Sequence, residues 1–106
     1  MPTSEKQLQI CLSGDIDHHK ASRLRREIDG TLLEHHPQLL ELNFKDVTFM
    51  DSSGVGLIMG RYRLITGWNG QLRVTEVSPQ IKKLMHLAGL DSLPIFSDST
   101  EEGANQ

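Results

Sequence analysis

The sequence contains few of the features that mark specialised classes of protein. A single cysteine, Cys11, cannot close an internal disulfide, so packing alone must hold the fold, as is usual for cytosolic proteins. No apolar run approaches the roughly 18 residues that span a bilayer, and the N-terminus lacks a signal-peptide core. Eleven Lys and Arg oppose fourteen Asp and Glu, giving a net charge of −3 spread along the chain. These absences argue against nucleic acid and membrane partners and predict a cytoplasmic protein.

The length bounds the organisation of the chain. A chain of 106 residues is long enough for one hydrophobic core and too short for two, so we expect a single domain over 1–106. The polar ends, 1–6 and 97–106, are expected to be loose.

Strand and helix patterns alternate along the chain. Apolar residues alternate with polar ones from Gln7 and predict a strand that Gly14 ends. An amphipathic helix follows, in which the basic cluster of Arg23, Arg25 and Arg26 is interpreted as a solvated face. Further strands are predicted at 39–44 and 72–77. A last helix begins at Ser78-Pro79, and its predicted buried face consists of Ile81, Leu84, Met85 and Ala88. This alternation predicts an α/β fold with a parallel core.

In the stretch from Val47 to Tyr62, a predicted strand is followed by a predicted helix without a linker. Asp51 and Ser52 are N-cap residue types, so the serine hydroxyls are expected where the unpaired N–H groups of the first turn converge. Gly54 and Gly56 lie in the first turns of this helix, where each glycine costs about 1 kcal/mol relative to alanine. Two explanations stay open: the glycines allow tight packing on the sheet, or they keep the serines accessible to another protein.

A second segment, Gly14 to His19, also follows a strand. Because ligands and partners gather at the carboxyl ends of parallel strands, both segments are expected to form one surface. The histidine pairs His18-His19 and His35-His36 lack the H-x-x-x-H spacing of helical metal sites, so no metal is predicted.

These two segments resemble a known family. Met50-Asp51-Ser52-Ser53-Gly54-Val55-Gly56, followed by Gly60-Arg61-Tyr62, is similar to the signature of the anti-sigma-factor antagonists of spore-forming bacteria, which belong to the STAS domain family. Gly14-Asp15-Ile16-Asp17-His18-His19 resembles the other diagnostic segment of that family. The resemblance runs from about Leu8 to Phe96 and implies a single STAS-like domain, an α/β fold with a mixed, mostly parallel sheet of four to five strands and crossover helices. The family's additional strand before Gln7 and its C-terminal helix have little counterpart in the sequence.

The resemblance also implies a function in transcription regulation, in sporulation or in general stress. The unphosphorylated protein is expected to bind an anti-sigma factor, which is also a serine kinase, and so to release a sigma factor. The kinase is expected to modify Ser52, with Ser53 as the runner-up, and a serine phosphatase to reverse this. The residues expected to contact the partner are Asp15, Asp17, His18, Asp51, Ser53 and Gly54. No cofactor is implied.

Two other classes of function were weighed against this switch. An enzyme with a serine nucleophile is not expected, because G-x-S-x-G is absent and His86, the only later histidine, lies on a helix whose packing explains it. The alternative function is a small-anion or nucleotide-binding STAS module, since a helix N-terminus can hold a phosphate. The phosphate-binding loop G-x-x-x-x-G-K-[ST] is missing, so we expect weak nucleotide binding or none.

Overall fold

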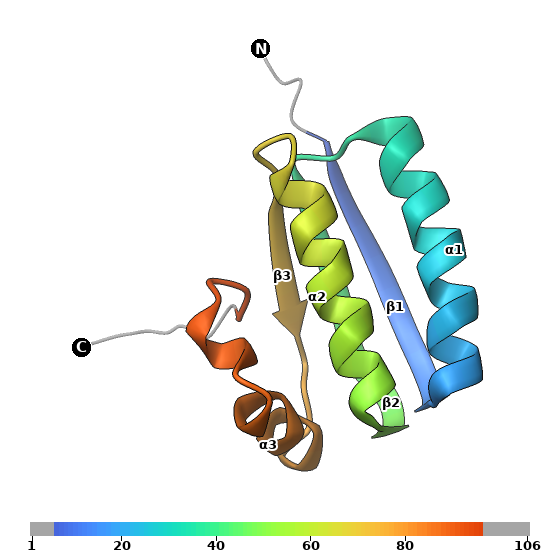
Figure 1. The fold of residues 1–106 in the computed structure, drawn as a ribbon, viewed down its shortest axis with the longest axis vertical. Helices are drawn as coiled ribbons and strands as arrows, with labels where there is room; N and C mark the ends of the chain where they lie inside the picture. Colours follow the sequence, from blue (N-terminus) through green and yellow to red (C-terminus); the bar gives the residue numbers. More distant parts are fainter. Residues whose placement is uncertain (1–5, 97–106) are drawn as a thin grey trace.

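A computed structural model describes residues 6–96, in which strands and helices alternate (Figure 1). The elements in chain order are β1 (Gln7–Ile16), α1 (His18–His35), β2 (Leu39–Met50), α2 (Ser52–Thr66), β3 (Gln71–Thr75), α3 (Pro79–Leu87) and the 3-10 turn η1 (Leu90–Ser92). The strands form one sheet in the order β1-β2-β3, and both pairings are parallel. In the described part of the chain, every helix is too short or too polar to cross a bilayer.

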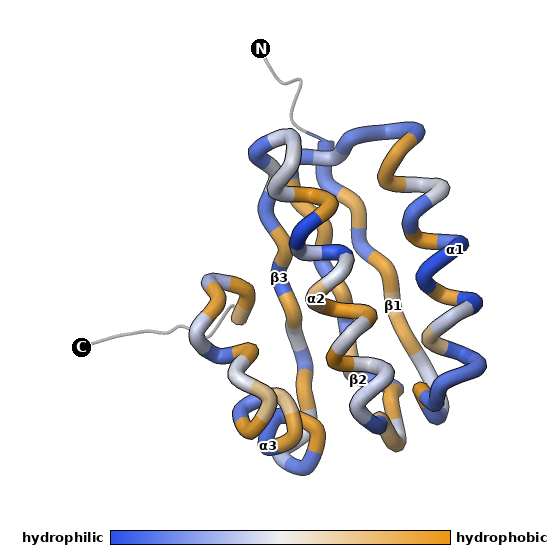
Figure 2. The backbone as a smooth tube through the Cα atoms, in the orientation of Figure 1, coloured by the Kyte–Doolittle hydropathy of each residue, from blue (hydrophilic) through white to orange (hydrophobic). Residues whose placement is uncertain are grey.

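Both long helices cover the same face of the sheet. Figure 1 shows α1 and α2 side by side in front of the strands, with α3 beside the carboxyl end of β3. Alternation along the strands, visible as changing colours on β1 and β3 in Figure 2, turns apolar side chains toward these helices. Phe44 on β2 and Ile58 on α2 are fully buried in this core. The opposite face carries a polar row, in which Gln9 and Thr75 both donate to the Glu41 carboxylate, at 3.2 and 2.7 Å.

β2 loses strict alternation toward its carboxyl end. Its pairing with β1 shifts register twice, between Cys11 and Ser13 and between Gly14 and Asp15. Each shift fits an extra residue in β2, so that Phe44, Val47 and Met50 all point inward at a spacing of three. The second shift leaves both Thr48 and Phe49 exposed beside the end of β1.

The structure confirms the α/β class and the parallel sheet with crossover helices, and it differs in several details. Three strands form the sheet over residues 6–96, and the predicted strand around Phe96 is reduced to one bridge to Val74. Gly14 does not end β1, because its positive φ of 72° accommodates the irregular pairing within the strand. Ala88 is exposed rather than buried, because it caps α3 where the chain turns away.

The ends of the chain fall mostly outside the described residues. The sequence predicts loose ends at 1–6 and 97–106 and has little counterpart for the family's strand before Gln7 and its C-terminal helix. Of these positions the structure describes Lys6 alone, whose carbonyl accepts the backbone N–H groups of Gln38 and Leu39 at 2.9 and 3.2 Å.

Candidate functional site

The serine corner, residues 50–54, joins the end of β2 to the start of α2. Asp51 is the N-cap: its backbone is extended, and its carboxylate accepts the Ser53 N–H at 2.8 Å. Ser52 is the first helical residue and is exposed. Among residues 6–96 its hydroxyl has no hydrogen-bond partner. Asp51 therefore performs the capping, and the Ser52 hydroxyl is left facing solvent.

Gly54 and Gly56 of α2 fit different explanations: tight packing on the sheet for one, and access to the serines for the other. Gly54 is buried, and a Cβ added there would meet Met50 Cγ and Sδ at 2.2 and 2.3 Å. Gly54 is thus required for packing, and it does not belong to the exposed surface. Gly56 is exposed, and an added Cβ would meet no atom within 4 Å. Of these two glycines, only Gly56 leaves open space where a side chain would stand.

The acidic turn, residues 14–19, joins β1 to α1 in a similar way. Asp17 caps α1 by accepting the Lys20 N–H at 2.9 Å, and this hydrogen bond is the main cause that lowers the pKa of Asp17 below its ordinary value of 3.8. The Lys20 ammonium donates to the Ser13 carbonyl and so ties the first turn of α1 back to β1. Asp17 and His18 are both exposed.

The structure brings the serine corner and the acidic turn together at one edge of the sheet. Ile16 pairs with Met50, and the Asp51 N–H donates to the Ile16 carbonyl at 3.3 Å. Asp15 lies beside Phe49 in the register and accepts the Thr48 hydroxyl at 2.8 Å. Figure 1 shows this edge as the lower end of the molecule, where β1, β2 and the starts of α1 and α2 meet.

A hollow of about 320 Å³ opens between the first turns of α1 and α2. It is lined by His18, Ala21, Ser22 and Arg25 of α1 and by Ser53, Gly56 and Leu57 of α2. Two of the residues predicted as partner contacts, His18 and Ser53, thus face a shared space. Arg25 belongs to the exposed basic face of α1, as predicted, and it also lines this hollow.

Sequence reasoning missed the ion pair that joins the two helices. Arg61 of α2 is 5% exposed, and its Nε lies 2.8 Å from Asp29 Oδ1 of α1. The contact has the separation of an ion pair but not the alignment of a hydrogen bond, and Arg61 Nη1 is buried without a partner in the described part of the chain. Burial lowers the pKa of Arg61, the Asp29 carboxylate opposes that shift, and the Arg25 charge adds to it. The spacing of 32 residues between the partners gave no sequence signal for this pair.

The exposure of Phe49 was also not predicted from the sequence. This residue is 52% exposed at the same edge as Ser52, in the stretch that the sequence predicts as the end of a strand. The register shift at Thr48 is what turns Phe49 outward, and a shift of this kind has no reliable signature in sequence.

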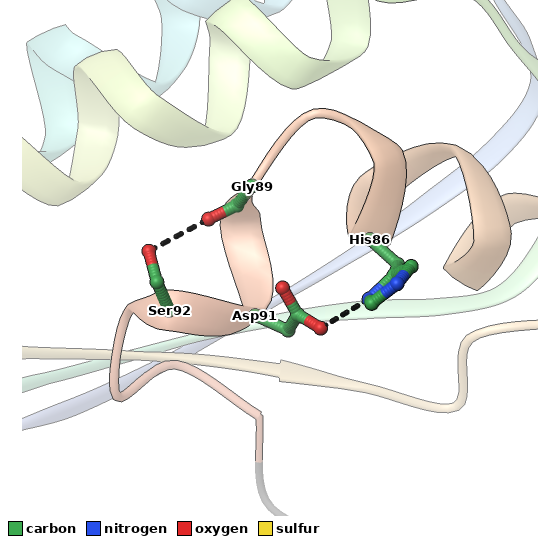
Figure 3. A network of polar contacts seen from close by, with 4 residues as sticks. All are labelled: His86, Gly89, Asp91 and Ser92. Carbon is green, nitrogen blue, oxygen red and sulfur yellow. Dashed lines mark hydrogen bonds and ion pairs between the residues drawn. The ribbon is translucent and has the colours of Figure 1, made fainter.

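His86 lies outside this site. Figure 3 shows its ring directed at the Asp91 carboxylate, while the Ser92 hydroxyl donates to the Gly89 carbonyl. The His86 side chain is 68% exposed, so packing does not account for its position, whereas its contact with the Asp91 carboxylate does. Both partners come from α3 and η1, not from the elements that carry Ser52. Within residues 6–96, no group of three or more His, Cys, Asp or Glu side chains is arranged to hold a metal ion.

The fold and the two motif segments define a class of protein. Residues 1–103 match the STAS domain family, so the chain belongs to this family. Among its relatives is the anti-sigma F factor antagonist of Paenibacillus polymyxa, 36% identical over 92 residues, which cover 86% of this chain and 79% of the relative.

Solved structures agree with this assignment. The unphosphorylated form of the anti-sigma factor antagonist SpoIIAA matches with a TM-score of 0.79 and 35% identity, covering 95% of this chain and 85% of that one. The phosphorylated form of the Bacillus protein SpoIIAA matches with a TM-score of 0.71 at 35% identity, covering 95% and 88%. The family resemblance inferred from the sequence is confirmed, and the relatives are regulatory proteins named as anti-sigma factor antagonists.

Proposed function

We propose that this protein is an anti-sigma factor antagonist controlled by phosphorylation of Ser52. The unphosphorylated form binds an anti-sigma factor that is also a serine kinase, and this binding releases a sigma factor. The kinase then modifies Ser52, with Ser53 as the second candidate, and a serine phosphatase restores the binding form. The protein itself acts as a binding module without catalytic residues or a cofactor.

The observation that carries this proposal is the exposed hydroxyl of Ser52, which has no hydrogen-bond partner in the part of the chain that the structure describes. Asp51 already caps α2, so Ser52 is not needed for the cap and is free to react. Ser53 is half-buried and lies against the hollow, which makes it the less accessible of the two hydroxyls. The relative SpoIIAA has been solved in an unphosphorylated and in a phosphorylated form, which supports the same chemistry for this chain.

The charges around Ser52 support a switch that acts at the interface. A phosphate adds about −1.5 to −2 charge, and at a helix N-terminus that charge stabilises the helix locally. Asp51 is adjacent, and Asp15 and Asp17 lie at the same edge of the sheet. A bound partner would cover a dianion surrounded by like charges. A loss of about 3 to 4 kcal/mol on this account weakens binding several hundred-fold.

The test is phosphorylation by the anti-sigma factor kinase with ATP, followed by mapping of the modified residue by mass spectrometry. We expect the phosphate on Ser52, its loss in Ser52→Ala, and its retention in the matched variant Ser53→Ala. Modification at neither serine contradicts the proposal.

The alternative function is a small-anion or nucleotide-binding STAS module. The start of α2 and the neighbouring Arg25 are compatible with an anion. Titration with a nucleotide in the absence of the kinase separates the two functions, and we expect binding to be weak or absent. Tight nucleotide binding whose affinity is the same in the wild type and in Ser52→Ala would favour the alternative.

A further inference from the structure

The hollow between α1 and α2 is formed by small residues at facing positions of two helices. Ala21 and Ser22 stand on one wall, and Gly56 stands on the other beside Leu57. A Cβ at Gly56 would meet no atom within 4 Å, so nothing in residues 6–96 fills the space in front of this glycine. Gly56 costs about 1 kcal/mol of helix propensity relative to alanine, and packing does not account for its presence as it does for Gly54.

The charges along this part of the α1–α2 contact are unbalanced. Arg25 lines the hollow, and Arg61 is buried nearby against the single carboxylate of Asp29. Arg25 and Asp29 lie one turn apart on α1, and Asp29 contacts Arg61, so the two guanidinium groups flank the same carboxylate. The Arg25 charge accordingly lowers the pKa of Arg61. On the Arg25 side of the hollow two cations therefore face one anion, whereas the Asp17 and Asp51 carboxylates lie on its other side, before the first turns of α1 and α2. An added negative group in the hollow would lower this repulsion, whereas an added positive group would increase it.

We propose that the hollow receives an acidic side chain of the anti-sigma factor, with Arg25 as its counter-ion. The apolar stem of that side chain lies against Ala21 and Leu57, and its carboxylate reaches the Arg25 guanidinium. This inference rests on the proposed function, because the hollow is continuous with the expected interface through His18 and Ser53.

The first test fills the hollow. Gly56→Leu places a side chain in the space, and Gly60→Leu is the matched control. Gly60 is one turn further along α2, also has no atom within 4 Å of an added Cβ, and does not line the hollow. Affinity for the purified anti-sigma factor is measured by titration calorimetry. We expect at least about a 10-fold weaker Kd for Gly56→Leu and a change of less than about 2-fold for Gly60→Leu.

Melting curves accompany these titrations. Gly56→Ala adds only a methyl group to open space, so it folds even where the leucine disturbs packing, and it is expected to weaken binding in the same direction. Equal affinities for the Gly56 and Gly60 variants would overturn the proposal.

The second test reverses one charge. Arg25→Glu is compared with Arg23→Glu, which is also at an exposed position on α1 and does not line the hollow. We expect Arg25→Glu to weaken binding about 10-fold or more, and Arg25→Lys to retain most of the affinity. The same loss in Arg23→Glu would show general charge steering and would also overturn the proposal.

Failure of this inference can be distinguished from failure of the proposed function. If the wild-type protein binds the anti-sigma factor and the hollow variants bind equally well, only the assignment of the hollow is wrong. If the wild-type protein does not bind, both are wrong. Self-association of the wild-type protein that Gly56→Leu abolishes would assign the hollow to a second copy and contradict the proposed occupant.

Discussion

Replacing Ser52 with aspartate separates two consequences of negative charge at the start of α2. Ser52 is the first residue of α2, directly after the capping carboxylate of Asp51. The new charge therefore interacts favourably with the helix dipole and unfavourably with its neighbour. The free energy of unfolding depends on both of these interactions. The dissociation constant for the partner shows how the charge acts at the interface.

The two contributions to stability nearly cancel. A carboxylate in the first turn stabilises a helix by about 0.3 to 1 kcal/mol. Two carboxylates about 6 Å apart in water repel each other by about 0.7 kcal/mol. The free energy of unfolding should thus change by less than about 0.5 kcal/mol, which moves the melting temperature by no more than about 4 °C in a domain of this size. Aspartate carries about half the charge of a phosphate, so it should cost about half of the 3 to 4 kcal/mol, and affinity for the anti-sigma factor should fall about 10- to 30-fold.

Circular dichroism melting and titration calorimetry measure the two quantities on the same preparation. Ser52→Asn is the control, because it has nearly the shape of aspartate without the charge, and it should bind more tightly than Ser52→Asp. If Ser52→Asp unfolds, or if it binds as tightly as the asparagine variant, the argument that charge acts at the interface is refuted.

Three further predictions concern the framework that holds the site. Gly54→Ala forces a methyl group into Met50, so the free energy of unfolding should fall by about 1 to 3 kcal/mol in urea titrations. Arg61→Ala leaves Asp29 unpaired and should cost roughly 2 to 4 kcal/mol, less than for a fully buried pair because Asp29 is 30% exposed. The pKa of Asp17 is lowered by the hydrogen bond from the first turn of α1, so its contribution to stability is present above its ordinary value of 3.8 and is lost as the pH falls through the folded pKa. In Asp17→Asn the free energy of unfolding should therefore fall less steeply as the pH is lowered through the acidic range.

Each of these predictions has a specific contrary result. For Gly54, the contrary result is a variant as stable as the wild type, which would mean that Met50 moves aside without cost. For the ion pair, it is an Arg61→Ala variant whose free energy of unfolding equals that of the wild type. For Asp17, it is an NMR titration midpoint at or above the ordinary value.

The sequence predicted the parts of the fold that follow from local chemistry. Asp51 caps α2 and α3 begins directly after Ser78, as predicted, because a short oxygen-bearing side chain before an apolar periodic run is a local signal. The meeting of the serine corner and the acidic turn followed from the rule that parallel strands end at one edge. Both predictions needed only the neighbours of each residue and the order of the elements.

Features that depend on register or on distant packing were not predictable in this way. The exposure of Phe49 results from an extra residue in β2, which a period-two pattern does not reveal. The pairing of Arg61 with Asp29 depends on how α1 lies against α2. The roles of the two glycines could be assigned only from the space that a Cβ would enter. Met50 occupies this space at Gly54, and it is open at Gly56.

The dissociation constant for the anti-sigma factor, measured before and after stoichiometric phosphorylation of the same sample, tests the central claim most directly. We predict tight binding by the unmodified protein, a several hundred-fold weaker constant once Ser52 carries phosphate, and full recovery after treatment with a serine phosphatase. A protein modified at Ser52 that binds its partner as tightly as before would contradict the account.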